Sequence, residues 1–278
     1  MKKIIFGLMV LCSTIFAGQV NIAVAANVSY AIDELVKEFN KTNPDTKIQV
    51  TLGSSGKFVT QIENGAPFDI FMSADMKFPQ SLYEKKLAKN VPVIYAQGSL
   101  AMLSSKKLDF SKGINVIKDS SISKIAVANP KTAPYGTAAM EAIKNAGLEE
   151  VTKDKFVYAE SISQAVTYAT TAADIGFIAK SSMYDEKMVQ YKENVNWVSV
   201  DPKLYTPIDQ GIVILLNAKD NKEIKAFYDF ILSKEAKRIF DVISDLMDII
   251  ERDAPNHYYK ADEIARADDM LKELEAQF

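Results

Sequence analysis

The chain has 278 residues, of which 48% are hydrophobic and 25% charged, and its formal net charge is −3. These values are typical of a globular protein, and they exclude a disordered chain or the strongly basic surface that nucleic acid requires. The charge is uneven, because residues 241–278 carry 11 acidic and 4 basic side chains and the rest of the chain is mildly basic. A mildly basic body is weak support for an anionic partner.

The first residues predict an exported protein. Lys2 and Lys3 precede an apolar run from Ile4 to Ala17, and small residues follow, which is the layout of a secretory signal peptide. The run is shorter than the roughly 20 residues of a membrane-spanning helix. We therefore interpret residues 1–18 as a cleaved leader.

The sequence offers little material for cysteine or histidine chemistry. The single cysteine, Cys12, lies inside the leader, and the single histidine is His257. The mature chain would therefore have no disulfide, cysteine nucleophile or thiolate metal site. No G-x-S-x-G, H-E-x-x-H or metal-spaced histidine cluster occurs, so nothing supports an enzyme.

Short apolar runs rich in β-branched residues alternate with helix-period segments, which predicts α/β lobes built on parallel sheets. In the first part of the body, strands are expected at 20–26, 47–52 and 68–75, and helices at 28–39 and 57–65. This order is βαβαβ. After residue 75 the pattern weakens until another apolar run begins at residue 99.

A second α/β set follows this run. Strands are expected at 99–105, 124–130, 155–159 and 174–179, and helices at 137–148 and 163–172. A strand at 210–217 and a helix at 222–233 are expected to rejoin the first set. The predicted organisation is a first lobe of residues 19–99 and 206–240, a second lobe of residues 100–205, and an acidic helical tail of residues 241–278.

Three loops each follow a predicted strand and open a helix, namely residues 25–29, 53–57 and 129–137. Ligands of open α/β sheets bind beyond the carboxyl ends of strands, where helix N-termini offer unpaired N–H groups. Asn27, Ser54 and Ser55 add side-chain donors. Helix capping explains the same residue types, so capping and ligand binding are both possible at this point.

The stretch "GSSGK" is not a nucleotide-binding P-loop. Only two residues separate Gly53 from Gly56, whereas a Walker motif has four between its glycines. Phe58 stands where that motif needs a Ser or Thr for magnesium. Lys57 is therefore interpreted as a solvated helix residue rather than a phosphate contact.

Four ordered segments resemble the molybdate-binding proteins of molybdate ABC transporters. They are "VAANVSYAIDELVKEF", "LGSSGKFVTQIENGAPFDIFMSAD", "ANPKTAPYGTAAMEAI" and "DIGFIAKSS". "GAPFDIFMSAD" is the most specific of these elements, being close to that family's G-A-P-x-D-x-F-x-S-A-D signature. The resemblance covers about residues 20–240.

The resemblance implies a two-lobed α/β fold of the type II periplasmic binding proteins, with a ligand cleft between the lobes. Its members bind molybdate or tungstate in the periplasm and deliver the oxyanion to an inner-membrane ABC permease. The implied protein is a binding protein without catalytic residues, resident cofactor or metal other than the bound oxyanion. A receptor for sulfate or phosphate, or an exported phosphate-ester enzyme, remains the alternative.

The resemblance also implies the residues of the oxyanion site. Asn27 and Ser55 would bind through their side chains, and Tyr135 and Ile162 through their backbone N–H groups. Further candidates at matching or adjoining positions are Ser54, Gly56 and Ala179. Many members have Ser in place of Asn27. Some have a Tyr that contacts the ligand in place of Ala179, so the hydrogen bond from that Tyr must be absent here or supplied by another residue.

The acidic tail does not match the family's usual ending. Helix spacing continues past Phe240 until Pro255, and a second apolar series runs from Ile264 to Phe278. We interpret this segment as a helical hairpin on the first lobe or a mobile terminus, and dimerisation or docking is the alternative. The protein is expected to be a monomer unless the tail dimerises.

Overall fold

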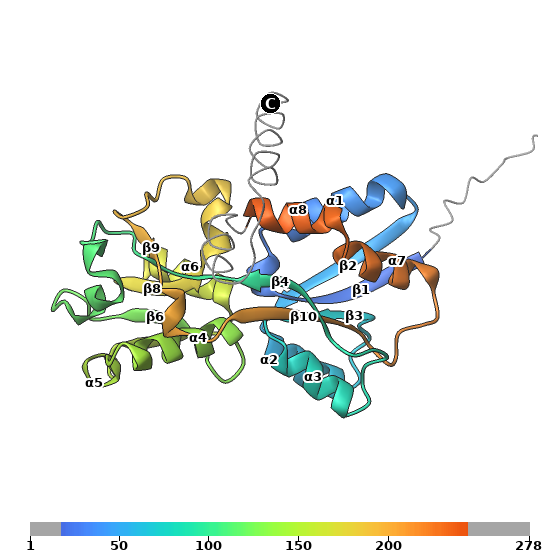
Figure 1. Ribbon diagram of the computed structural model, residues 1–278, viewed down its shortest axis with the longest axis horizontal. Coiled ribbons are helices and arrows are strands. Elements are labelled where there is room, and N and C mark those ends of the chain that lie inside the picture. The colour runs from blue at the N-terminus through green and yellow to red at the C-terminus, as the bar shows by residue number, and fades with distance from the viewer. Residues whose placement is uncertain (1–17, 244–278) are drawn as a thin grey trace, which may run out of the picture. The chain divides into compact units, whose positions relative to one another are not determined.

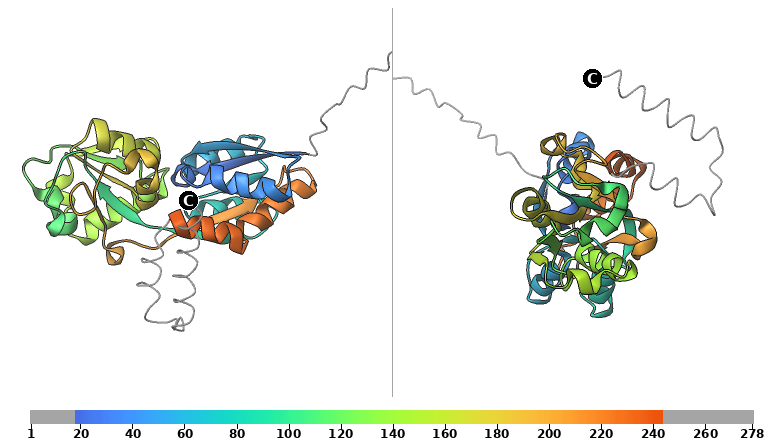
Figure 2. Two further views of the ribbon diagram at one scale, coloured as in Figure 1. Left: turned by 90° about the horizontal axis from the view of Figure 1, so that it is seen from above. Right: turned by 90° about the vertical axis from the view of Figure 1, so that its left-hand side faces the viewer.

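The computed structural model describes residues 18–243, whose strands form two five-stranded sheets (Figure 1). The signal-peptide prediction for residues 1–17 and most of the predicted tail therefore lie outside the described residues. Figure 2 shows the two sheets with their helices as groups side by side, one blue and orange, the other green and yellow. We call these groups the first and the second lobe.

The sheet of the first lobe has the order β2-β1-β3-β10-β4. Its strands are β1 (Gly18–Ala25), β2 (Thr46–Gly53), β3 (Ile70–Met72), β4 (Val93–Gly98) and β10 (Ile208–Ile214). Its helices are α1 (Ile32–Thr42), α2 (Ser55–Glu63), α3 (Lys77–Glu84), α7 (Lys222–Ile231) and α8 (Lys234–Ile243). The strands β2, β1 and β3 are parallel, whereas β10 is antiparallel to both of its neighbours.

The two faces of this sheet are covered by different helices, because strand side chains alternate between faces. Val20, Ile22 and Val24 of β1 pack in one cluster with α1, α7 and α8. Ala23 lies on the opposite face, in a cluster with residues of α2 and α3. Both faces are thus buried, which explains why β1 is apolar along most of its length.

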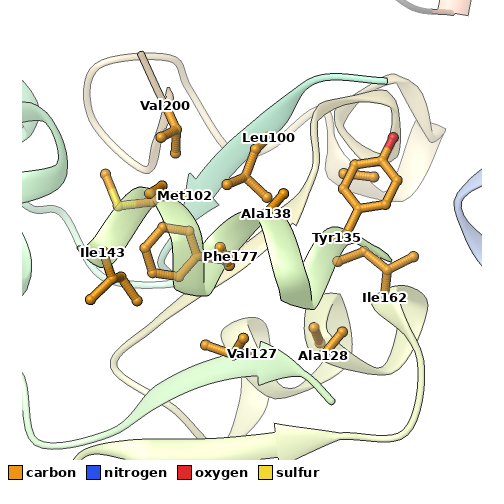
Figure 3. Packing of buried hydrophobic residues seen from close by; sticks show 14 of the residues in the cluster. Leu100, Met102, Val127, Ala128, Tyr135, Ala138, Ile143, Ile162, Phe177 and Val200 are labelled. Carbon is orange, nitrogen blue, oxygen red and sulfur yellow. The ribbon is translucent and has the colours of Figure 1, made fainter. Parts of the chain in front are cut away.

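The sheet of the second lobe has the order β7-β6-β8-β5-β9. Its strands are β5 (Leu100–Leu103), β6 (Ile125–Ala128), β7 (Phe156–Ala159), β8 (Ile175–Ala179) and β9 (Trp197–Ser199). Its α-helices are α4 (Pro134–Asn145), α5 (Glu149–Thr152) and α6 (Ile162–Thr171), and short 3-10 helices fill the connections. Figure 3 shows Leu100, Met102 and Phe177 packed around α4, and α6 contributes Val166 and Ala169 to the cluster on the other face.

Two segments cross between the lobes. Only Ser99 separates β4 of the first sheet from β5 of the second, and the chain returns between β9 and β10. The prediction of parallel sheets is correct for β2-β1-β3 and for β7-β6-β8. It is wrong for the strands next to the crossings, since β5 and β10 run antiparallel to their neighbours.

The helix α3 and the strand β4 were not predicted, because their sequence lacks a regular pattern. Val93 and Ile94 are exposed in succession before the buried Tyr95. The pairing of β4 with β10 also shifts register at Gln210 and Gly211, which breaks strict alternation. Between residues 18 and 243, no helix has the length and apolar character needed to cross a membrane.

Candidate functional site

A pocket lies where the first residues of three α-helices and one 3-10 helix meet. The 3-10 helix is η1 (Ala26–Val28), and the α-helices are α2 of the first lobe and α4 and α6 of the second. The pocket encloses about 200 Å³, including its opening to solvent.

The strand order explains why these helix starts converge. The strand β1 leads directly into η1, and Ser54 alone separates β2 from α2. In the second lobe, β6 leads to α4 and β7 leads to α6. The carboxyl ends of the parallel strands of both sheets therefore face one pocket, which is where open α/β sheets bind ligands.

The pocket favours negative charge through dipoles. None of its lining residues carries a formal charge. Helix geometry leaves the first N–H groups of each helix without an intrahelical acceptor, and these positions carry a partial positive charge. Ser55, Tyr135 and Ile162 occupy such positions in α2, α4 and α6. The pocket thus presents converging donors to an anion.

Two buried polar atoms in the pocket have no hydrogen-bond partner. Among the described residues, three buried side-chain atoms lack one, and two of these, Asn27 Oδ1 and Ser54 Oγ, belong to residues that line the pocket. An unpaired buried polar group costs about 1–3 kcal/mol. The concentration of this cost at one pocket is typical of a binding site rather than a structural core.

Within the protein, the side chain of Ser55 has one hydrogen-bond partner, whereas that of Asn27 has two, Gln210 and Tyr135. Asn27 Nδ2 donates to Gln210 Oε1 at 2.8 Å, and the backbone N–H of Ala74 donates to Ser55 Oγ at 3.0 Å. Because Ser55 Oγ accepts from Ala74, its own proton is available to a ligand. Helix capping alone does not explain either serine, since α2 has no side-chain cap.

Tyr135 lies at the start of α4 next to Ile162 (Figure 3). Its ring is buried, and burial raises the pKa of its hydroxyl, so the side chain stays neutral. A Cβ at Gly98 would overlap Tyr135 Oη, which explains why glycine stands at the crossing between β4 and β5. The side chain therefore packs against the crossing segment and hydrogen-bonds the Asn27 side chain, and the backbone N–H of Tyr135 is the donor that it offers to a ligand.

The lobes contact each other around the pocket. Gly56 N donates to Thr132 O at 2.9 Å, and Ser163 Oγ donates to Ala26 O at 2.9 Å. A Cβ at Gly56 would come within 2.9 Å of Thr132 Cα, so only glycine permits this approach. Lys57 of α2 forms an ion pair with Glu160 of the second lobe, both side chains being about half exposed.

The pocket brings together five of the seven residues singled out from the sequence, namely Asn27, Ser54, Ser55, Tyr135 and Ile162. Gly56 lies beside the pocket at the contact between the lobes. Ala179 is buried at the end of β8 and does not line the pocket. Lys57 is a partly exposed helix residue, and the structure adds its ion pair with Glu160.

The three loops predicted from the sequence contain most of the small and apolar lining without naming its residues, whereas Ala74 and the residue behind Asn27, Gln210, lie outside them. Six further residues line the pocket: Ala25, Ala26, Gly53, Ala74, Ala133 and Pro134. Small residues let the backbone approach a ligand, but they give no distinctive sequence signal. Gln210 did have a sequence signal, because it is a polar residue immediately before the apolar run "GIVILL".

The described residues include no group of three or more His, Cys, Asp or Glu side chains that could hold a metal ion.

A family model described as bacterial extracellular solute-binding protein matches residues 20–241. The chain belongs to this family. The fold described above, two α/β lobes around a pocket, agrees with this membership.

Relatives of this solute-binding protein include the molybdate-binding protein ModA of Azotobacter vinelandii, 35% identical over 80% of this chain and 88% of the relative. The ModA of Rhodobacter capsulatus is 36% identical over 80% of this chain and 86% of the relative. The solved periplasmic molybdate-binding protein of Azotobacter vinelandii has a TM-score of 0.74, with 27% identity over 81% of this chain and 97% of that one. The structure agrees with the predicted type II periplasmic binding fold.

The sulfate-binding protein SubI of Mycobacterium tuberculosis also has this fold. Its TM-score is 0.69, with coverage of 87% of this chain and 92% of that one. Its sequence identity is only 10%, so this likeness concerns the fold alone.

Proposed function

We propose that this solute-binding protein binds molybdate or tungstate between its lobes and delivers the oxyanion to an inner-membrane ABC permease. The protein would act in the periplasm as a single chain, without turnover and without a resident cofactor. The observation that carries the proposal is the pocket, where three helix N-termini and two unpartnered polar atoms converge and no lining residue is charged. The ModA relatives support the choice of ligand.

The donors around the pocket are sufficient for tight binding. The candidates are the side chains of Asn27, Ser54 and Ser55 and the backbone N–H groups of Tyr135 and Ile162. At about 1.5–3 kcal/mol for each hydrogen bond to a charged group, five donors contribute roughly 8–15 kcal/mol. This range corresponds to dissociation constants from about micromolar to picomolar, before the costs of ordering are subtracted. A counter-charge from lysine or arginine is therefore not required.

Titration calorimetry with molybdate, tungstate, sulfate and phosphate tests this proposal. We expect saturable binding of molybdate and tungstate with one site per chain, and weaker binding of sulfate and phosphate. Absence of molybdate binding would overturn the proposal, and a preference for sulfate or phosphate would make the protein a receptor for that anion. Turnover of a phosphate ester that Asn27→Ala abolishes would instead indicate an enzyme.

A further inference from the structure

We propose that Gln210 and Tyr95 are positioning residues that orient the Asn27 amide, so that it presents an N–H donor rather than a carbonyl oxygen to the bound oxyanion. This inference rests on the proposed function, because it concerns the same pocket. It adds two residues that do not line the pocket and assigns them a role in anion selectivity.

A buried chain of hydrogen bonds connects these residues. Asn27 Nδ2 donates to Gln210 Oε1 at 2.8 Å, and Tyr95 Oη lies 2.9 Å from Gln210 Oε1 and 3.2 Å from Ser73 O. All three side chains are at least nine-tenths buried, Tyr95 at 8% exposed and the other two at 5%. Asn27 also forms a side-chain hydrogen bond with Tyr135 of α4, so this series of hydrogen bonds reaches the second lobe.

The acceptor that takes the single proton of Tyr95 sets the direction of these hydrogen bonds. The carbonyl of Ser73 can only accept a hydrogen bond, whereas Tyr95 has a single proton to donate. Burial raises the pKa of Tyr95 well above its usual value, so the proton is present at neutral pH. If Tyr95 donates to Ser73, its oxygen must accept from the Gln210 amide N–H₂. Gln210 can then donate its second N–H to Asn27 Oδ1.

This arrangement turns Asn27 Nδ2 towards the pocket. In the structure the two amides have the opposite orientation, and Asn27 Oδ1 is the atom without a partner. A half-turn of each terminal amide changes one arrangement into the other, because the oxygen and nitrogen of an amide occupy nearly the same space. The Tyr95 oxygen, both N–H groups of the Gln210 amide and Asn27 Oδ1 are then paired, and an anion can accept from Asn27 Nδ2.

The two orientations select different anions. Molybdate and tungstate are fully deprotonated at neutral pH and accept hydrogen bonds with every oxygen, so a carbonyl oxygen facing them is repulsive. Hydrogen phosphate carries a proton and needs one acceptor in its site. When Asn27 Nδ2 faces the pocket, all the polar side chains there donate hydrogen bonds to the anion, which favours molybdate. When Asn27 Oδ1 faces the pocket instead, it can accept a hydrogen bond from the proton of hydrogen phosphate.

The test is titration calorimetry of the purified protein with molybdate and with phosphate at pH 7. Tyr95→Phe removes the hydroxyl that fixes the direction, and Gln210→Met removes the connecting amide. Each change is made in the native background and in an Asn27→Ser background. A hydroxyl at position 27 rotates and needs no neighbour to present a donor. Tyr228→Phe is the matched control, because its hydroxyl accepts from Asn90 in the first lobe outside this chain.

We expect Tyr95→Phe and Gln210→Met to weaken molybdate binding about tenfold in the native background. The preference for molybdate over phosphate should fall by at least as much. In the Asn27→Ser background the same changes should alter molybdate affinity by less than about twofold, and Tyr228→Phe should alter neither. Equal losses in both backgrounds would overturn the proposal by showing that these residues act without Asn27, and so would unchanged affinity in the native background. A native protein that binds no molybdate would remove the proposed function, and this inference with it.

Discussion

Ser54 and Ser55 are adjacent at the start of α2 and both line the pocket, yet they differ in their hydrogen bonds. Ser55 Oγ accepts from Ala74 N, whereas Ser54 Oγ is buried without a partner. A buried hydroxyl without a partner destabilises the folded protein, and a ligand that accepts from it removes this cost. Substitutions of the two serines should therefore differ in their effect on the stability of the unliganded protein, although both should weaken anion binding.

Replacing each serine by alanine should separate these effects. Ser54→Ala should weaken molybdate binding about tenfold and leave the thermal midpoint of the protein without added anion unchanged or slightly higher. Ser55→Ala should weaken binding similarly but also lower that midpoint, because Ala74 N loses its acceptor inside the protein. Calorimetric titration and thermal unfolding of both variants check this. A lower midpoint for Ser54→Ala would contradict our interpretation of its hydroxyl.

At the scale of elements, Asp174 connects the starts of two neighbouring strands. It precedes β8, and its Oδ2 accepts hydrogen bonds from Ser123 N at 2.8 Å and Lys124 N at 2.9 Å, just before β6. Its Oδ1 accepts from Lys106 Nζ at 2.6 Å. The hydrogen bond from Lys106 is the largest cause that holds the pKa of Asp174 well below its usual 3.8, and the backbone N–H groups add to it.

Asp174→Asn should lower the free energy of unfolding at pH 7 by about 1–3 kcal/mol, since it weakens hydrogen bonds to a charged group. A carboxyl whose pKa is lower in the folded state contributes stability above its unfolded pKa and loses it as pH falls through the folded value. The difference from the native protein should therefore shrink progressively below about pH 3.8. Denaturant titrations from pH 7 to pH 2 check this, and a constant difference would contradict it. The exposed Asp45→Asn is the control at pH 7.

The elements were predictable wherever local pattern and burial agree. The apolar run at residues 20–26 became β1, and the helix-spaced apolar residues after it became α1. Asn27 and Ser55 could be named because a polar residue between a buried strand and a helix is a local signal. The contacts of Gly56 with Thr132 and of Asn27 with Gln210 join residues far apart in the chain, so no local pattern could predict them.

At the scale of the whole molecule, Lys57 and Glu160 form an ion pair that exists only while the lobes touch. Lys57 lies on α2 of the first lobe, and Glu160 precedes α6 of the second. Any interaction present in one arrangement of the lobes and absent from the other shifts the balance between them. If the anion binds between touching lobes, this ion pair must contribute to anion affinity. Because both side chains are about half exposed, its contribution is about 0.2–1 kcal/mol.

A double-mutant cycle measures this contribution without the direct effect of each charge on the anion. Lys57→Met, Glu160→Gln and the double variant should give a coupling free energy of about 0.2–1 kcal/mol in molybdate affinity at low salt. The coupling should nearly vanish at about 1 M salt, where the screening length is about 3 Å. The ion pair between Lys85 and Glu63 lies within the first lobe and is the matched control. The same cycle on that pair should give no coupling in affinity, because the pair is present whether or not the lobes touch. Equal coupling for both pairs would contradict a role of the Lys57–Glu160 pair in bringing the lobes together.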